Sequence, residues 1–165
     1  MPEYHPRPRS LPWLERLAMR LPGYGGYQER GHRREAERIL LDAIAARLRV
    51  ARDQIDTAIR QCIEREALSE INSLERIRQH IDRVADRLRL AEAGTDHFYN
   101  VEHLGPDKTD PLHVVDLELF ETVEALAHRF EQPDLDHNRL AHIEEDLRKL
   151  EIKLDQRALM LQGIG

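Results

Sequence analysis

A stretch of 62 residues, His32 to Ala93, contains neither glycine nor proline. Alanine, leucine, arginine, glutamate and isoleucine dominate it, and these residue types favour helix. Apolar side chains recur in it at alternating spacings of three and four residues, which is the seam of a coiled-coil-like helix. Nowhere in the chain do polar and apolar residues alternate between turn residues, as a strand would require. The sequence therefore predicts an all-α protein.

The seam consists of two runs that are out of phase with each other. They comprise Leu41, Ile44, Leu48, Ala51, Ile55, Ala58 and Cys62, and then Leu74, Ile77, Ile81, Val84, Leu88 and Ala91. Either one continuous helix shifts its seam between the runs, or the chain turns near Ser69–Ser73, where side-chain oxygens can cap a helix. One helix would be about 93 Å long and would need a partner over most of that length. We favour the turn, which makes residues 28–92 a long helical hairpin.

A polar connection at residues 93–110 is predicted to lead into a second hairpin at residues 111–161. Asp110 and Pro111 are typical of a helix start, with aspartate as the cap and proline in the first turn. Pro133 separates two helices whose apolar faces are Leu112, Val115, Leu119, Val123, Leu126 and Phe130, and then Leu140, Ile143, Leu147, Leu150 and Leu154. We expect the two hairpins to pack as an elongated four-helix bundle.

Residues 1–27 form a separate basic and aromatic arm in this prediction. Pro12–Leu21 is an amphipathic stretch too short to be a stable helix alone in water, so it needs a surface to dock on. That surface is the bundle itself, a membrane interface or a partner. Half of the eight aromatic residues precede residue 28, although bundles normally use aromatics in their cores. The residues predicted to bind a partner are Trp13, Leu14, Arg16, Leu17, Arg20, Tyr24, Tyr27, Arg30, Arg33 and Arg34.

The net charge of −6 is distributed unevenly, with +5 on residues 1–52 and −10 on residues 91–165. Opposite ends of this kind attract each other within a fold or between copies. Together with the heptad seams, they predict a homo-oligomer. The basic arm also suits an anionic membrane surface. Binding to RNA or the ribosome is less favoured, because glutamates interrupt the basic patch and the pI near 5.8 is low for a nucleic-acid-binding domain.

A metal site is a further possibility that the spacing does not favour. Histidines and acids gather around the polar connection, and together they suit zinc, manganese or iron. The candidate ligands are His97, His103, His113, Asp96 and Glu102. They match no closed-site pattern, and no pair of helices repeats the Glu-x-x-His motif of di-iron bundles. The sequence thus predicts no resident metal and no other cofactor.

Signatures of catalysis are missing from the sequence. There is no glycine-rich phosphate loop, and none of the three serines has the context of a hydrolase nucleophile. The single cysteine, Cys62, lies on the seam and is interpreted as a small buried apolar residue. We therefore expect a protein that is not an enzyme and has no small-molecule substrate.

These observations predict a helical interaction or scaffold protein that presents its arginine- and aromatic-rich arm to a protein partner or to a second copy. The alternative is a peripheral protein that binds anionic lipid through the same arm. No apolar run approaches the roughly 20 residues of a membrane-spanning helix, and the first ten residues lack the apolar core of a signal peptide. The expected location is the cytoplasm, with attachment to a membrane surface as a variant.

Overall fold

The computed structural model describes residues 12–24, 33–98, 106–132 and 135–161, which contain five α-helices and no strand. The prediction of an all-α helical bundle is therefore confirmed. None of the described helices combines the length and apolarity needed to cross a bilayer. The helices are α1 (Pro12–Arg20), α2 (Arg33–Glu64), α3 (Leu68–Phe98), α4 (Pro106–Glu131) and α5 (His137–Leu161).

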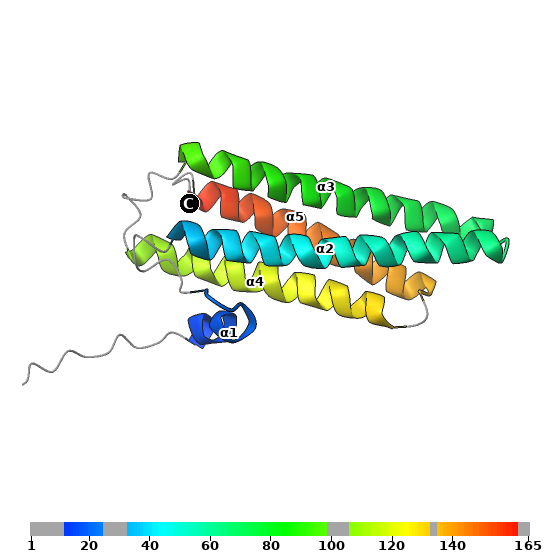
Figure 1. Ribbon diagram of the computed structural model, residues 1–165, viewed down its shortest axis with the longest axis horizontal. Coiled ribbons are helices and arrows are strands. Elements are labelled where there is room, and N and C mark those ends of the chain that lie inside the picture. Colours follow the sequence, from blue (N-terminus) through cyan, green and yellow to red (C-terminus); the bar gives the residue numbers. More distant parts are fainter. Residues whose placement is uncertain (1–11, 25–32, 99–105, 133–134, 162–165) are drawn as a thin grey trace, which may run out of the picture.

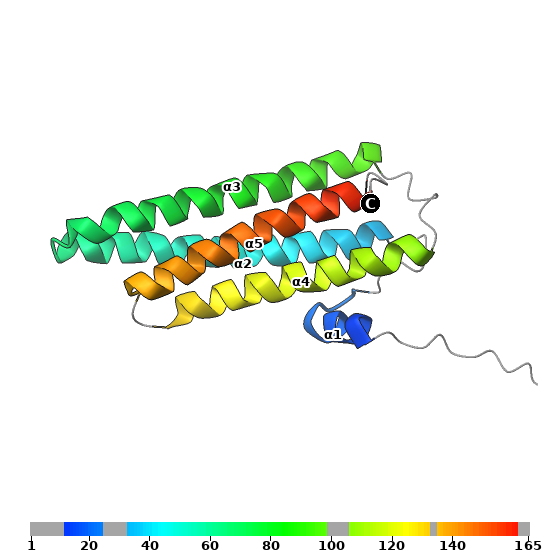
Figure 2. The same cartoon turned by 180° about the vertical axis from the view of Figure 1, so that it is seen from behind.

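The four long helices form an elongated bundle of two antiparallel hairpins (Figures 1 and 2). Helix α2 pairs with α3, and α4 pairs with α5. The hairpins then pack so that α2 lies beside α4 and α3 lies beside α5. Neighbours from different hairpins run in the same direction, and the closed end of the α2–α3 hairpin projects beyond that of α4–α5 (Figure 1). Helix α2, with 32 residues, is about 48 Å long.

The core is built from the apolar faces that the three-and-four spacing predicts. All residues of the four predicted faces are buried except Ala58 and Ala91, which are partly exposed. Cys62 is 2% exposed, as expected for a small residue on the seam. Each long helix packs mainly against two of the other long helices, so its buried face is wider than a two-position seam. This width accounts for the additional core residues Leu40, Ile59, Leu117 and Phe120.

The phase break in the seam is a tight turn at residues 65–67. Glu66 has φ 58°, in the left-handed region, and the N–H of Ala67 donates to the carbonyl of Cys62 at 2.9 Å. This geometry closes α2 in the way that a glycine usually does. The turn comes earlier than the predicted Ser69–Ser73, whose residues all lie within α3. The hairpin is thus present, and the alternative of one continuous helix is wrong.

Helical structure extends further into the predicted connection at residues 93–110 than we expected. Helix α3 continues through Gly94 to its end, and α4 begins at Pro106. A proline in the first turn costs no hydrogen bond, because the N–H groups there have no partner within the helix. Pro111, predicted to begin the third helix, is instead internal to α4 and removes one of its hydrogen bonds. Residues 99–105 fall outside the described residues.

Candidate protein-interaction surface

Helix α1 packs on the outside of the bundle, against α4 (Figures 1 and 2). Its Leu17 is fully buried, and Leu21 and Tyr24 in the segment that follows are 3% exposed. Met19, in contrast, is 86% exposed. With nine residues, α1 is too short to persist alone in water. Its helical structure therefore depends on docking.

Two arginines of α1 form ion pairs with two glutamates of α4. Arg16 Nη2 lies 2.6 Å from Glu121 Oε1, and Arg20 Nη1 lies 2.9 Å from Glu124 Oε2. The four side chains remain 33–58% exposed. Exposed pairs contribute about 0–1 kcal/mol each and are weakened by salt. These pairs orient α1 on α4 but do not fasten it strongly.

The chain leaves α1 through a turn that reaches α2. Gly23 has φ 85°, a conformation that only glycine adopts without strain. A Cβ atom added there would lie 3.3 Å from Cδ1 of Ile39 in α2. The N–H of Tyr24 donates to the carbonyl of Leu21 at 3.1 Å. Helix α1 and its turn therefore contact both α4 and α2.

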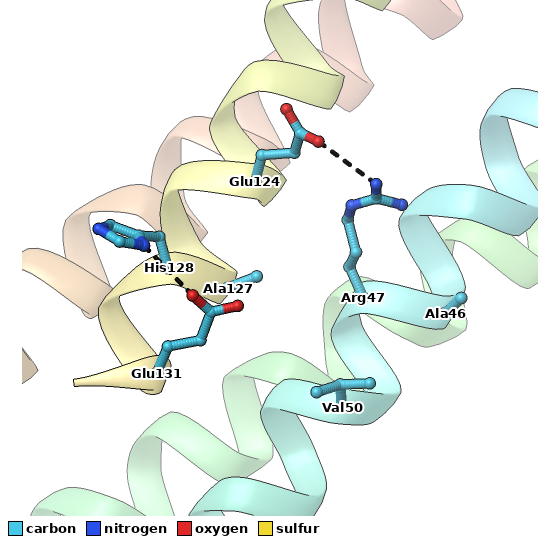
Figure 3. A pocket seen from close by; sticks show the side chains of 7 residues that line it. All are labelled: Ala46, Arg47, Val50, Glu124, Ala127, His128 and Glu131. Carbon is cyan, nitrogen blue, oxygen red and sulfur yellow. Dashed lines mark hydrogen bonds and ion pairs between the residues drawn. The ribbon is translucent and has the colours of Figure 1, made fainter. Parts of the chain in front are cut away.

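A hollow of about 480 Å³ opens between α2 and α4 (Figure 3). It lies next to the α1 docking position, because its lining residue Glu124 pairs with Arg20 of α1. Its apolar part consists of two alanines and Val50, which is 54% exposed. Acidic side chains of α4 border it. The residues that line it are Ala46, Arg47, Val50, Glu124, Ala127, His128 and Glu131.

Glu124 connects the docking position of α1 with this hollow. It forms an ion pair with Arg20 of α1 at 2.9 Å and accepts a hydrogen bond from Arg47 Nη2 of α2 at 3.3 Å. The Arg47 guanidinium also lies 4.5 Å from the centre of the Phe120 ring, in cation–π geometry. At the other end of the hollow, Glu131 Oε2 lies 3.3 Å from His128 Nδ1. The hollow thus continues the surface on which α1 is docked.

The predicted partner-binding residues fall into two groups. Leu17 and Tyr24 are buried, and Arg16 and Arg20 are paired with α4, so these four contact the chain's own bundle. The others fall outside the residues whose side chains are described: Trp13, Leu14, Tyr27, Arg30, Arg33 and Arg34. Glu121 and Glu124 were not identified from the sequence. Their only signal was a spacing of three within the acidic half of the chain.

A second group of charges lies in the interior. Arg157 of α5 donates from Nε to Asp116 of α4 and from Nη1 to Glu37 of α2, each at 2.8 Å. All three residues are at most 3% exposed. The cluster joins three helices, and its residues do not line the hollow between α2 and α4. The arrangement is that of a structural ion cluster.

Of the candidate metal ligands, His113 is completely buried in α4. The side chains of Asp96, His97, Glu102 and His103 are outside the described part of the structure. Within that part, no group of three or more His, Cys, Asp or Glu side chains is placed to hold a metal ion. The described residues therefore give no geometry on which to argue metal chemistry.

Cys62 lies near the turn between α2 and α3, beside a smaller hollow of about 240 Å³. Its Sγ is 3.6 Å from Glu70 Oε2 and 3.9 Å from Arg65 Nη2. The thiol is buried between a carboxylate and a guanidinium, and these contacts join the two sides of the turn.

Comparison of the chain with protein-family models finds no match, and comparisons with curated proteins and with solved structures find none either.

Proposed function

We propose that the protein is a non-enzymatic helical interaction protein whose N-terminal segment attaches to a protein partner or to a second copy of the chain. The observation that carries this proposal is how α1 is held. A short amphipathic helix lies on the outside of α4, fastened by Leu17, the turn after it and exposed ion pairs. A segment held in this way can exchange its own bundle for another surface.

Approximate energies support such an exchange. The side chains of Leu17, Leu21 and Tyr24 are buried, and each contributes about 1.5–3 kcal/mol to docking. Each exposed ion pair contributes about 1 kcal/mol at most, and ordering the segment costs about 1–2 kcal/mol per residue in backbone entropy. A partner that binds with micromolar affinity supplies about 8 kcal/mol. Undocking α1 is therefore within reach of an ordinary protein–protein interaction, and the four long helices keep their own apolar seams.

Photochemical crosslinking from position 19 tests the proposal directly. Met19 is 86% exposed, so a benzoylphenylalanine placed there leaves the docked face of α1 intact. In the protein's own cells, we expect this site to crosslink to a specific protein or to a second copy. Crosslinks should decrease when Arg16→Glu and Arg20→Glu are introduced, because these two arginines are among the residues predicted to bind the partner.

Position 152 provides the matched control. Ile152 is 56% exposed on α5, away from α1. Specific crosslinks from position 19, absent from position 152, would support the proposal. If both positions crosslink to the same background, or if position 19 reaches only α4 of its own chain, the proposal is wrong.

Attachment to an anionic lipid surface is the second candidate. The observation that favours it is the exposure of Met19 beside two arginines that are about half exposed. An apolar side chain flanked by cations suits the headgroup boundary. Cosedimentation with vesicles containing anionic lipid should then exceed cosedimentation with neutral vesicles, and Arg16→Glu with Arg20→Glu should remove the difference. Equal cosedimentation with both vesicle types would dismiss this candidate.

A further inference from the structure

We infer that the surface between α2 and α4 is a docking groove for a basic amphipathic helix of a partner protein, and that α1 occupies one part of it in the free chain. The α2–α4 groove is defined by Glu121, Glu124 and Glu131 at its acidic border and by Val50 and Ala127 in its apolar part. This inference shares with the proposed function the release of α1 from α4, but it concerns what binds in the groove and not what the arm binds.

Helix α1 indicates what the groove binds. Residues 16–21 read Arg-Leu-Ala-Met-Arg-Leu, so an arginine followed by a leucine recurs after one helical turn. Leu17 is buried against the bundle, and the two arginines reach Glu121 and Glu124. The chain itself therefore provides an example of a basic amphipathic helix docked on α4.

The groove is longer than the part that α1 occupies. The ion pairs between the described residues of α1 and α4 end at Glu124, which also lines the hollow (Figure 3). From Glu124 to Glu131 the hollow follows α4 for about 10 Å. Val50 and Ala127 lie along this part, and Val50 is 54% exposed. A helix longer than α1 would cover this apolar surface in addition to the α1 position.

Charge selects the kind of occupant. Three glutamates border the groove on α4, and Glu131 is 66% exposed. Arg47, which also lines the hollow, already pairs with Glu124 and covers the Phe120 ring. An acidic helix or an anionic lipid surface would meet like charge along this border. A helix with arginine or lysine on each side of an apolar stripe complements both the border and the apolar part.

Exchange with α1 follows from the difference in length. Helix α1 has nine residues and ion pairs that are largely exposed. A partner helix of about 20 residues makes the same contacts and also buries Val50 and Ala127. The partner helix therefore displaces α1, and α1 reduces the fraction of chains whose groove is open.

Peptide binding to the full-length chain tests the inference. The ligand is a fluorescein-labelled peptide of 20 residues in which the arginine and leucine pattern of residues 16–21 recurs along one helical face. Fluorescence anisotropy measures its dissociation constant. We expect binding to be about fivefold tighter for the chain carrying Arg16→Glu and Arg20→Glu, because the loss of two exposed ion pairs opens the groove.

Groove variants show where the peptide binds. In the chain with the opened groove, Glu131→Arg should weaken binding of the long peptide about tenfold, and Val50→Asp should weaken it further. A short peptide of residues 12–24 should be unaffected by either change, because the described ion pairs of this segment with α4 end at Glu124. Glu145→Arg, at an exposed position on α5, is the matched control and should leave both dissociation constants unchanged.

Two results would overturn the inference. The first is a dissociation constant that is the same for the Glu131→Arg and Glu145→Arg chains, since binding would then lie elsewhere. The second is a dimer of the unsubstituted chain in sedimentation velocity that Arg16→Glu with Arg20→Glu abolishes. Such a dimer would assign the groove to the arm of a second copy. Circular dichroism of each variant verifies that the bundle is folded.

Discussion

Arg157 lies where α2, α4 and α5 meet, and its guanidinium donates to Glu37 and Asp116. Taking charges out of water costs several kcal/mol each, and good pairing is needed to offset this cost. Sliding any one of the three helices by a turn would separate a buried charge from its partner. The cluster therefore contributes more to fixing one register of the bundle than to the overall stability of the fold.

Replacing Arg157 with methionine would leave two carboxylates buried without their cation. We predict that Arg157→Met lowers the free energy of unfolding by about 3–5 kcal/mol, measured by urea denaturation. Arg148→Met, at an exposed position on the same helix, is the control and should change it by about 0.5 kcal/mol or less. Equal effects of the two substitutions would show that the buried cluster does not fix the packing.

A surface ion pair on α5 gives a prediction about pH. The pKa of Glu145 is lowered by its interaction with Lys149, whose Nζ lies 3.1 Å from Oε1. A lowered carboxyl pKa means that the pair favours the folded state above the unfolded-state pKa of about 4.3. This contribution is lost as the pH falls through the folded-state pKa. Lys149→Gln should therefore raise the pKa of Glu145, which carbon-13 NMR titration can measure. An unchanged pKa would contradict this assignment.

Most of the apolar faces of the four long helices were predictable from the spacing, whereas the buried charges were not. Arg157 follows Leu154 by three residues and Glu37 precedes Leu41 by four, so both occupy extensions of the predicted seams. A charge at a seam position was the available signal. It does not reveal its partners, because Glu37 and Arg157 are 120 residues apart in the chain. Only the packed bundle brings them together.

Among the secondary-structure elements, the ends were harder to predict than the helices themselves. The turn between α2 and α3 uses Glu66 in the left-handed conformation, where glycine is the usual signal. Conversely, residues 93–110 were predicted to be a connection and Pro111 to begin a helix, but Gly94 lies inside α3 and Pro111 inside α4. Local propensities of about 1 kcal/mol for glycine are small against the packing of a whole helix face. Local signals of this size are therefore weak guides to where a helix ends.

The left-handed conformation of Glu66 predicts that glycine stabilises the folded state more than alanine at this position, which is the reverse of the usual order within a helix. At Glu66, glycine should give a folded state about 1 kcal/mol more stable than alanine, because φ is 58°. At Ala125, exposed within α4, the native alanine should be more stable than glycine by about 1 kcal/mol. Urea unfolding of Glu66→Gly, Glu66→Ala and Ala125→Gly beside the unsubstituted chain gives both differences. If alanine is more stabilising than glycine at both positions, residue 66 is not in the left-handed conformation.

At the scale of the whole molecule, some of the basic residues of the N-terminal part form ion pairs with acidic residues of the C-terminal part. The basic N-terminal part supplies Arg16, Arg20 and Arg47, and the acidic C-terminal part supplies Glu121 and Glu124. The uneven charge was visible in the sequence, and it predicted attraction within a fold or between copies. Which helix faces would meet could not be predicted, because the seams alone do not specify that α2 lies beside α4.

The central claim is that α1 is docked on the bundle but separable from it. Hydrogen exchange measures this most directly, because weakly held elements exchange before the core. We predict that amides of α1 exchange well before those of α4 around Leu119, and that raising sodium chloride from about 0.05 M to about 1 M accelerates only α1. Arg16→Glu with Arg20→Glu should also accelerate it, and adding Glu121→Arg with Glu124→Arg should restore protection. If α1 exchanges as slowly as α4 and does not respond to salt or charge reversal, it is an integral part of the bundle and the claim is wrong.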